Sequence, residues 1–412
     1  MEKSSHRRQI VLIFIAWFVY VSSYVGRSAV NANVIAIQEY FSADKVEVGL
    51  IGTYFFVAYG IGQFVNGILC KYYNPKYVIT CSLTISSILN LIIFFDFLPF
   101  GAIKYIWFIN GAALSMLWTS IINTLSKSLD KKYIDMAIVI TATTVAAGTF
   151  VSYGLSALFS LFKAFKLSFL AGAIFMVVGA VIWFVLFDKL TKKEDALCGM
   201  VVQEQERSKK AKMPKDIRNS MIIFAFIAII INFVKDGITT WVPDVLNTSF
   251  SLPESLSIIL TIVLPLLAVF GAMFASWLNK HIKDFPCLVG VLFALTSVFI
   301  FIVVLMLKSP MWYLTIIAFG VCSLITSASN NVVTSIMPFS YKDRINSGFV
   351  AGILNGFCSV GSALSPSLMG LMFEYFNNWQ SVFVVVLGLA LVAMVVCYAT
   401  FIISKLKKNK AQ

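Results

Sequence analysis

The chain has 412 residues, of which 59% are hydrophobic and 12% charged, and its mean hydropathy is +0.88. A water-soluble domain of this length cannot bury so large an apolar share, so the composition excludes a soluble globular protein. The formal net charge of +13 does not indicate nucleic-acid binding, because the basic residues lie mostly in short segments between apolar runs, where they meet anionic lipid head groups.

Apolar runs follow one another along the chain, and each is long enough to cross a bilayer as a helix, which takes about 20 residues. In chain order, the predicted spans are 10–38, 46–70, 77–98, 101–128, 136–162, 165–188, 217–247, 253–281, 285–307, 309–337, 345–375 and 378–404. We therefore expect an all-α integral membrane protein with twelve transmembrane helices.

Basic residues concentrate on one set of alternate loops, which includes both ends of the chain. Of the 32 Lys and Arg residues, two lie within spans, and those on the opposite set of loops are only Lys45, Lys104, Lys163, Lys166 and Lys308. By the positive-inside rule, this bias predicts that both termini are cytoplasmic.

The strongest break in composition is the charged stretch from Lys189 to Arg218. It divides the chain into a predicted N-terminal six-helix bundle (1–188), a cytoplasmic linker (189–216) and a C-terminal six-helix bundle (217–412). The charged stretch is either a linker between two halves that move against each other or a solvated loop with some surface helix.

The seven cysteines are scattered and form no CxxC pair, and the chain has only two histidines. We therefore expect neither a disulfide framework nor a structural metal, and no cofactor. No nucleophile–base pair is apparent either, so the sequence does not predict an enzyme.

Two cations interrupt the apolar spans. Arg27 lies in the first span, and Lys235 lies at the same depth in the seventh, the corresponding helix of the second half. A charge in the middle of a span costs about 2.5–3.5 kcal/mol even on the mild insertion scale, so both side chains must face the bundle interior, water or an anion. The symmetry predicts a binding site near the midplane, between the two repeats.

Arg27 shares one helical face with Tyr20, Tyr24 and Asn31, at spacings of i, i+4, i+7 and i+11. This stripe either lines a binding cavity or joins helices through hydrogen bonds. No carboxylate within the spans of the first half is an obvious partner for Arg27, and this favours the binding role.

Lys235 shares a helical face with Asn232 and Thr239, and Asp236 is expected on a different side of the same helix. We interpret Lys235 as a ligand-binding cation, with a structural ion pair as the alternative. Asp236 is interpreted as the only membrane-embedded carboxylate that lies well away from both ends of its span.

Further polar stripes occur in the second, tenth and eleventh spans. They consist of Tyr59, Gln63 and Asn66, of Ser323, Ser327 and Asn330, and of Asn355, Ser359 and Ser362. Each stripe is typical of helix packing as well as of ligand contact.

The two cations within the spans point to the charge of the ligand. Two cations that face one cavity repel each other, and a small dianion relieves the repulsion, while the planar fork of arginine matches phosphate oxygens. The residues indicate a carrier of small anions, with phosphate esters as the natural candidates.

Five segments carry a family likeness that extends over nearly the whole chain. They are YVGR (Tyr24–Arg27), VAYGIGQFVNGILCKYYNPK (Val57–Lys76), LW (Leu117–Trp118), KDGITTWVP (Lys235–Pro243) and AGILNGFCSVGSALSP (Ala351–Pro366). They resemble the major facilitator superfamily and, within it, the organophosphate:phosphate antiporters, which include carriers of glycerol 3-phosphate, hexose phosphates and glucose 6-phosphate. The resemblance implies two pseudo-symmetric six-helix bundles.

The resemblance also implies roles for individual residues. Arg27 and Lys235 bind the substrate phosphate, and the matching aromatic positions are Tyr20, Tyr24, Tyr59 and Trp118. Gln63 and Asn355 complete the predicted substrate-binding set. Gln63 stands where some bacterial members have lysine, Thr143 where some have histidine, and Lys71-Tyr72 where the superfamily usually has Asp-Arg. Because the chain departs from the family pattern at these positions, the resemblance identifies neither its substrate nor the ion whose movement is coupled to transport.

The leading hypothesis is a monomeric secondary transporter of a bacterial plasma membrane that exchanges a phosphate ester for inorganic phosphate by alternating access. One alternative is proton-coupled symport of a carboxylate or sulfonate monoanion, with Asp236 as the proton carrier. A second is a sensor that binds a phosphorylated ligand without transport. Multidrug efflux is disfavoured, because Arg27 and Lys235 repel cationic compounds.

Overall fold

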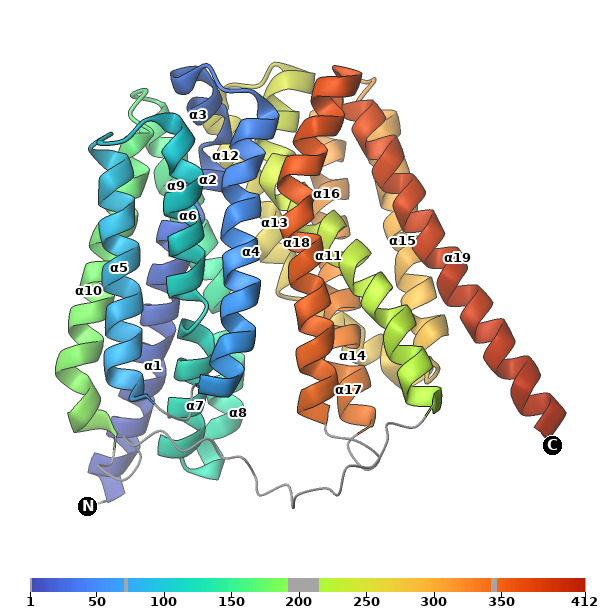
Figure 1. The fold of residues 1–412 in the computed structure, drawn as a ribbon, viewed down its shortest axis with the longest axis horizontal. Helices are drawn as coiled ribbons and strands as arrows, with labels where there is room; N and C mark the ends of the chain where they lie inside the picture. Colours follow the sequence, from blue (N-terminus) through green and yellow to red (C-terminus); the bar gives the residue numbers. More distant parts are fainter. Residues whose placement is uncertain (1, 70–72, 192–214, 342–346, 412) are drawn as a thin grey trace. The chain divides into compact units, whose positions relative to one another are not determined.

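The computed structural model describes residues 2–69, 73–191, 215–341 and 347–411 (Figure 1). Every regular element in these residues is helical, and twelve spans are long and apolar enough to cross a membrane. The predicted fold class and number of spans are therefore confirmed. The boundaries differ by several residues in places; the seventh span, for example, is Ile217–Phe250.

The helices follow one another with short connections. In the first part of the chain they are α1 (Glu2–Arg27), α2 (Ala29–Ala32), α3 (Val34–Phe41), α4 (Lys45–Leu69), α5 (Pro75–Phe94), α6 (Phe100–Leu114), α7 (Leu117–Ser128), α8 (Lys131–Ala142), α9 (Thr144–Ser160) and α10 (Lys166–Leu190). In the second part they are α11 (Lys215–Phe250), α12 (Glu254–Thr261), α13 (Val263–Ala268), α14 (Gly271–His281), α15 (Phe285–Met306), α16 (Trp312–Asn331), η1 (Val332–Ile336), α17 (Met337–Ser340), α18 (Ser347–Phe376) and α19 (Trp379–Ala411).

The fourth and fifth spans are interrupted at residues whose hydroxyl side chains bond back to their own helix. The fourth span breaks at Ser115, whose hydroxyl donates to the Ala112 carbonyl at 2.7 Å. The fifth breaks at Thr143, whose hydroxyl donates to the Ile140 carbonyl at 2.8 Å. Such back-bonding bends helices. The tenth span continues from α16 into η1, a π-helical segment with a wider turn of a kind found frequently at functional sites.

The third and ninth spans begin with the same kind of cap. The Asn74 side chain accepts a hydrogen bond from the Lys76 amide at 2.9 Å, and Pro75 begins α5. The Asp284 side chain accepts from the Cys287 amide at 3.2 Å, and α15 likewise has a proline in its first turn. A short polar cap followed by proline satisfies an amide that has no partner within the helix and presets the helical backbone.

By their contacts, the residues group into two compact units. The first comprises residues 1–37 and 54–212, and the second comprises 38–53 and 213–412. The start of α4 therefore packs with the second unit, although the sequence division placed it in the N-terminal bundle. The predicted linker falls largely on residues 192–214, outside the described part of the chain, so the division into two six-helix bundles and a linker stays a prediction.

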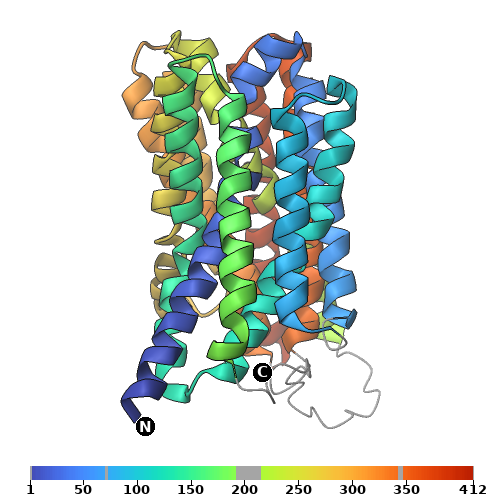
Figure 2. The same ribbon diagram turned by 90° about the vertical axis from the view of Figure 1, so that its left-hand side faces the viewer.

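In the first unit, α10 lies beside both α5 and α1, and α1 also packs along α9 (Figure 2). Hydroxyl groups join these helices: Ser87 donates to the Ala173 carbonyl at 3.0 Å, and Ser152 donates to the Val25 carbonyl at 2.9 Å. Interhelical hydrogen bonds of this kind stabilise helix pairs in an apolar surrounding. The bond from Ser152 attaches α9 to α1 at Val25, two residues before Arg27.

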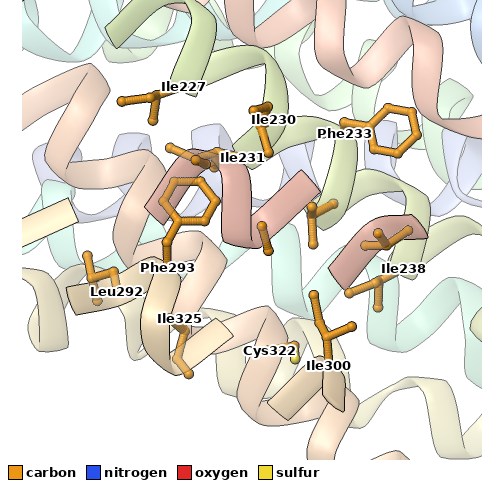
Figure 3. Packing of buried hydrophobic residues seen from close by; sticks show 14 of the residues in the cluster. Ile227, Ile230, Ile231, Phe233, Ile238, Leu292, Phe293, Ile300, Cys322 and Ile325 are labelled. Carbon is orange, nitrogen blue, oxygen red and sulfur yellow. The ribbon is translucent and has the colours of Figure 1, made fainter. Parts of the chain in front are cut away.

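In the second unit, α11 packs along α18 and α16. Its apolar side chains join those of α15 and α16 in one core, in which Ile231, Phe293 and Ile325 are buried (Figure 3). Lipid tails are as apolar as these side chains, so association of the helices depends on close packing rather than on escape from water. The fit between α11 and α18 is therefore sensitive to small changes in shape.

Replacing Gly361 with alanine is expected to destabilise the protein by about 1–3 kcal/mol. A Cβ atom at this position of α18 would overlap the Ile229 carbonyl oxygen of α11 and lie 3.0 Å from the Phe233 nitrogen. Both are backbone atoms that cannot turn away. The matched control is Gly352→Ala in the same helix, where a Cβ meets nothing within 4 Å. Thermal unfolding in detergent compares the two variants, and an equal midpoint would contradict the tight contact.

The described cysteines Cys81, Cys287, Cys322, Cys358 and Cys397 are free thiols. Cys70 and Cys198 lie outside the described residues, as does the Lys71-Tyr72 pair, so the predictions made for them are not tested.

Candidate functional site

Aromatic rings surround the Arg27 guanidinium at the end of α1. Its Cζ atom lies 4.6 Å from the centroid of the Tyr24 ring, 4.8 Å from Phe55, 5.2 Å from Tyr59 and 5.9 Å from Phe56. Contacts of this length are cation–π interactions, which stabilise a cation by the negative face of a ring. The four rings thereby fix the position of the guanidinium.

The other predicted residues of the first unit extend this group. The Tyr20 ring lies 5.4 Å from that of Tyr24 and 4.7 Å from that of Trp118, and Gln63 hydrogen-bonds the Tyr59 side chain. We call the set Tyr20, Tyr24, Arg27, Phe55, Phe56, Tyr59, Gln63 and Trp118 the Arg27 cluster. The structure thus brings together every substrate-binding residue predicted in the first half of the chain. The sequence reasoning missed Phe55 and Phe56, because phenylalanine in an apolar span gives no polar signal.

Two polar positions near the predicted site have partners that suit a packing role. The buried Asn66 amide donates to the Ser115 hydroxyl at 3.2 Å and accepts from the Tyr73 hydroxyl at 2.6 Å. Thr143, at the position where some relatives have histidine, accepts a hydrogen bond from the Trp17 indole at 3.0 Å. These bonds join neighbouring helices of the first unit.

In the second unit, Lys235 belongs to a polar network. Its Nζ atom lies 3.3 Å from Asp236 Oδ1 and donates to Asn232 Oδ1 at 3.3 Å. The Asn232 amide donates to Asn330 Oδ1 at 3.0 Å, and the Ser362 hydroxyl donates to Asp236 Oδ2. We call these five residues the Lys235 cluster. It joins α11 to α16 and α18.

Lys235 and Asp236 are adjacent in α11, so their Cα atoms diverge around the helix, but their side chains nevertheless form an ion pair. The long lysine side chain folds back until its ammonium reaches the neighbouring carboxylate at 3.3 Å. The side chains are 31% and 16% exposed, respectively. Lys235 therefore carries a counter-charge, and the predicted arrangement of two bare cations does not hold in the second unit.

Asn355, the last predicted substrate-binding residue, is exposed on α18, where its carbonyl accepts from the Ser359 hydroxyl at 3.2 Å. It does not belong to the Lys235 cluster as defined above. Its role in binding stays a prediction.

A second Lys–Asp pair of this unit did not emerge from the sequence. Lys45 Nζ donates to the two carboxylate oxygens of Asp244 at 2.6 and 2.7 Å, and the two side chains are only 8% and 3% exposed. The Trp379 indole donates to the same carboxylate at 2.8 Å and the Gln38 amide at 3.2 Å, while the Phe373 ring centroid lies 4.4 Å from Lys45 Nζ.

This pair places a second carboxylate in the seventh span, nearer to its end than Asp236, and the interpretation of Asp236 as the only embedded carboxylate well away from both ends stays a prediction. Asp244 lies in the seventh span, Ile217–Phe250, and is more deeply buried than Asp236. The signal in the sequence was Asp244 itself, a carboxylate between apolar residues directly after Pro243. Lys45 lies at the start of its helix, next to a predicted loop, so its burial has no signal in the sequence.

Comparisons with known proteins agree with the fold. Residues 16–349 match the sequence profile of the Major Facilitator Superfamily. The chain is 23% identical to a glycerol-3-phosphate transporter of Bacillus subtilis (strain 168), over 95% of this chain and 92% of the relative. It is 20% identical to a hexuronate transporter of the same organism, over 93% and 92%.

A solved structure of a bacterial homologue of the human lysosomal transporter Spinster superposes with a TM-score of 0.75. It is 15% identical and covers 95% of this chain and 96% of its own. At this identity the likeness concerns the fold alone. With the profile match and the twelve spans, it confirms the resemblance drawn from the motifs: the chain belongs to the major facilitator superfamily and is a multi-pass membrane transporter.

Proposed function

We propose that the protein exchanges a phosphate ester for inorganic phosphate by alternating access. The observation that carries this proposal is the Arg27 guanidinium, whose position is fixed by four aromatic rings. The planar fork of arginine matches phosphate oxygens. The similarity to a glycerol-3-phosphate transporter over 95% of the chain supports the same substrate class.

In this proposal, each cluster has its own part. Arg27 binds two oxygens of the phosphate, and Lys235 adds a flexible point charge. The hydroxyls of Tyr20, Tyr24 and Tyr59, with the Gln63 amide, donate hydrogen bonds to the substrate, while Trp118 and Asn355 contact its organic part. Binding of the anion lowers the barrier between the two orientations of the carrier, and the gradient of inorganic phosphate drives uptake of the ester. We further propose that the protein acts as a monomer in a bacterial plasma membrane, with both termini cytoplasmic.

One rival function has an observation in its favour. The relative named as a hexuronate transporter covers 93% of the chain, and a hexuronate is a carboxylate. Proton-coupled symport of such a monoanion would use Asp236, whose side chain is 16% exposed, as the proton carrier.

Counterflow in proteoliposomes distinguishes the two functions. Vesicles that contain the purified protein and internal phosphate are expected to take up labelled glycerol 3-phosphate, and vesicles without internal phosphate are not. An internal pH-sensitive dye is expected to show no acidification during uptake. Uptake that needs no internal phosphate and acidifies the lumen would instead establish proton symport. Binding of glycerol 3-phosphate with no flux under either condition would indicate a sensor.

A further inference from the structure

We propose that Asn330 is a positioning residue for Lys235 and that it acts through the carboxamide of Asn232. The inference rests on the proposed function, because it concerns the binding of an anion by Lys235. All three residues belong to the second unit, and their hydrogen bonds connect α16 to the ammonium on α11. In the sequence, Asn330 is only one member of the polar stripe in the tenth span.

The members of this stripe have two kinds of partner in the structure. The hydroxyls of Ser323 and Ser327 donate to backbone carbonyls of α13, each at 3.0 Å, and thereby attach α16 to α13. Asn330 Oδ1 instead accepts from side chains of two other helices, from the Asn232 amide of α11 at 3.0 Å and from the Cys358 thiol of α18 at 3.4 Å. The two serines therefore pack helices together, whereas Asn330 contacts the network around the ammonium.

The Asn232 carboxamide connects Asn330 to the ammonium. Both hydrogen atoms of its NH2 group are used, one by the Ala228 carbonyl at 3.1 Å and one by Asn330 Oδ1 at 3.0 Å. The carboxamide oxygen thereby faces Lys235 Nζ at 3.3 Å. The opposite orientation would place the NH2 group against the ammonium and the oxygen against a carbonyl, so it is excluded.

Burial makes this orientation depend on Asn330. The Asn232 side chain lies in a residue that is only 3% exposed, so water cannot replace a lost partner. Without the Asn330 acceptor, one N–H of the carboxamide would be buried and unsatisfied, and the group would gain by rotating. Its oxygen would then leave the ammonium.

The backbone of Asn330 lies where α16 changes into the π-helical η1. Asn330 is the last residue but one of α16, and η1 begins at Val332. The Thr334 hydroxyl of η1 donates to the Asn330 carbonyl at 2.8 Å, which attaches the residue to the wider turn. Wider turns of this kind are found frequently at functional sites. Here the turn follows directly after the member of the stripe that contacts the network of Lys235.

Positioning matters for Lys235 because its charge sits on a flexible stem. The side chain is 31% exposed, and ordering such a side chain when a ligand binds costs entropy. An oxygen that is held in a fixed place beside the ammonium removes part of this cost before the anion arrives. Asn330 therefore raises the affinity for an anion without touching it.

A double-mutant cycle between the two asparagines tests the inference, with inorganic phosphate as the probe. In the full-length protein, Asn330→Leu is expected to weaken phosphate binding by about five- to tenfold, because one buried hydrogen bond that orients the carboxamide is lost. Asn232→Leu is expected to weaken binding at least as much. The double variant should lose no more than Asn232→Leu alone, because Asn330 then has nothing left to orient. Equilibrium titration with labelled phosphate in detergent measures each affinity.

Two comparisons separate positioning from packing. Ser327→Ala is the matched control, because it removes another hydrogen bond between α16 and a neighbouring helix, and it should leave the phosphate affinity unchanged. In Lys235→Met, which has no ammonium to orient, Asn330→Leu is expected to change the remaining affinity no further. Asn330→Ala removes the same acceptor and takes the place of Asn330→Leu if the unfolding midpoint shows that the leucine variant is not folded.

The outcomes distinguish this inference from the proposed function. Wild-type affinity in Asn330→Leu, or losses that add in the double variant, would overturn the inference alone. An equal loss in Ser327→Ala would do the same, because it would assign the effect to helix packing. If the wild-type protein binds no phosphate, or if Lys235→Met binds it as tightly as the wild type does, the proposed function fails and the inference fails with it.

Discussion

Replacing Lys45 with methionine is expected to destabilise the protein by about 3–5 kcal/mol, because it leaves the Asp244 carboxylate buried without its cation. The side chain of Asp244 is 3% exposed, so water cannot replace the lost ammonium. The hydrogen bonds from the Trp379 indole and the Gln38 amide remain, but they do not supply a compensating charge. The midpoint of thermal unfolding in detergent measures the loss.

Two further variants make this result specific. Lys45→Met combined with Asp244→Asn removes both charges, and we expect it to recover a large part of the lost stability. Lys76→Met removes the cation paired with Asp188, whose side chain is 66% exposed, so the carboxylate left behind stays hydrated and the expected cost is about 1 kcal/mol or less. If Lys76→Met destabilised the protein as much as Lys45→Met, burial would not be the reason for the effect.

Replacing Arg27 with leucine is expected to weaken binding of glycerol 3-phosphate by about a hundredfold or more, and to abolish counterflow. The substitution removes two charge-assisted hydrogen bonds to the phosphate, each worth about 1.5–3 kcal/mol. Arg27→Lys keeps the charge but loses the fork, and we expect an intermediate loss of about tenfold. Competition of the unlabelled ester against labelled phosphate measures both affinities.

The control for Arg27 is an arginine with no part in the proposed site. Arg218 is exposed near the start of α11, and Arg218→Leu is expected to bind and transport as the wild-type protein does. Unfolding midpoints close to that of the wild type ensure that the Arg27 variants are folded. Normal transport of the ester by Arg27→Leu would show that the site has been assigned to the wrong residues.

The twelve spans could be predicted because length and hydrophobicity are local properties of each segment. The breaks within spans could not. The hydroxyls of Ser115 and Thr143 bond back to the preceding turn where a helix ends, but those of Thr124 and Thr141 do the same inside continuous helices, so the residue type alone does not predict a break. The π-helical η1 after Asn331 likewise has no pattern in the sequence that distinguishes it from ordinary helix.

The distinction between local and non-local properties also explains which residues of the site could be predicted from the sequence. Tyr20, Tyr24 and Arg27 lie on one helix at regular spacing, so their proximity follows from helical geometry alone. The ion pair of Lys235 and Asp236 depends on the conformation of the flexible lysine side chain, which a helical wheel does not describe. The pair of Lys45 and Asp244 joins residues 199 apart in the sequence, and no local pattern connects them.

The two Lys–Asp pairs differ in how far apart their partners lie in the sequence, and this difference has a consequence for biosynthesis. Lys235 and Asp236 are neighbours within α11, so a newly made α11 can enter the bilayer with this charge already compensated, which lowers the cost of inserting it. The ion pair of Lys45 with Asp244 can instead form only after α11 has been synthesised. The start of α4 can therefore settle only late in assembly, after most of the first unit has left the ribosome.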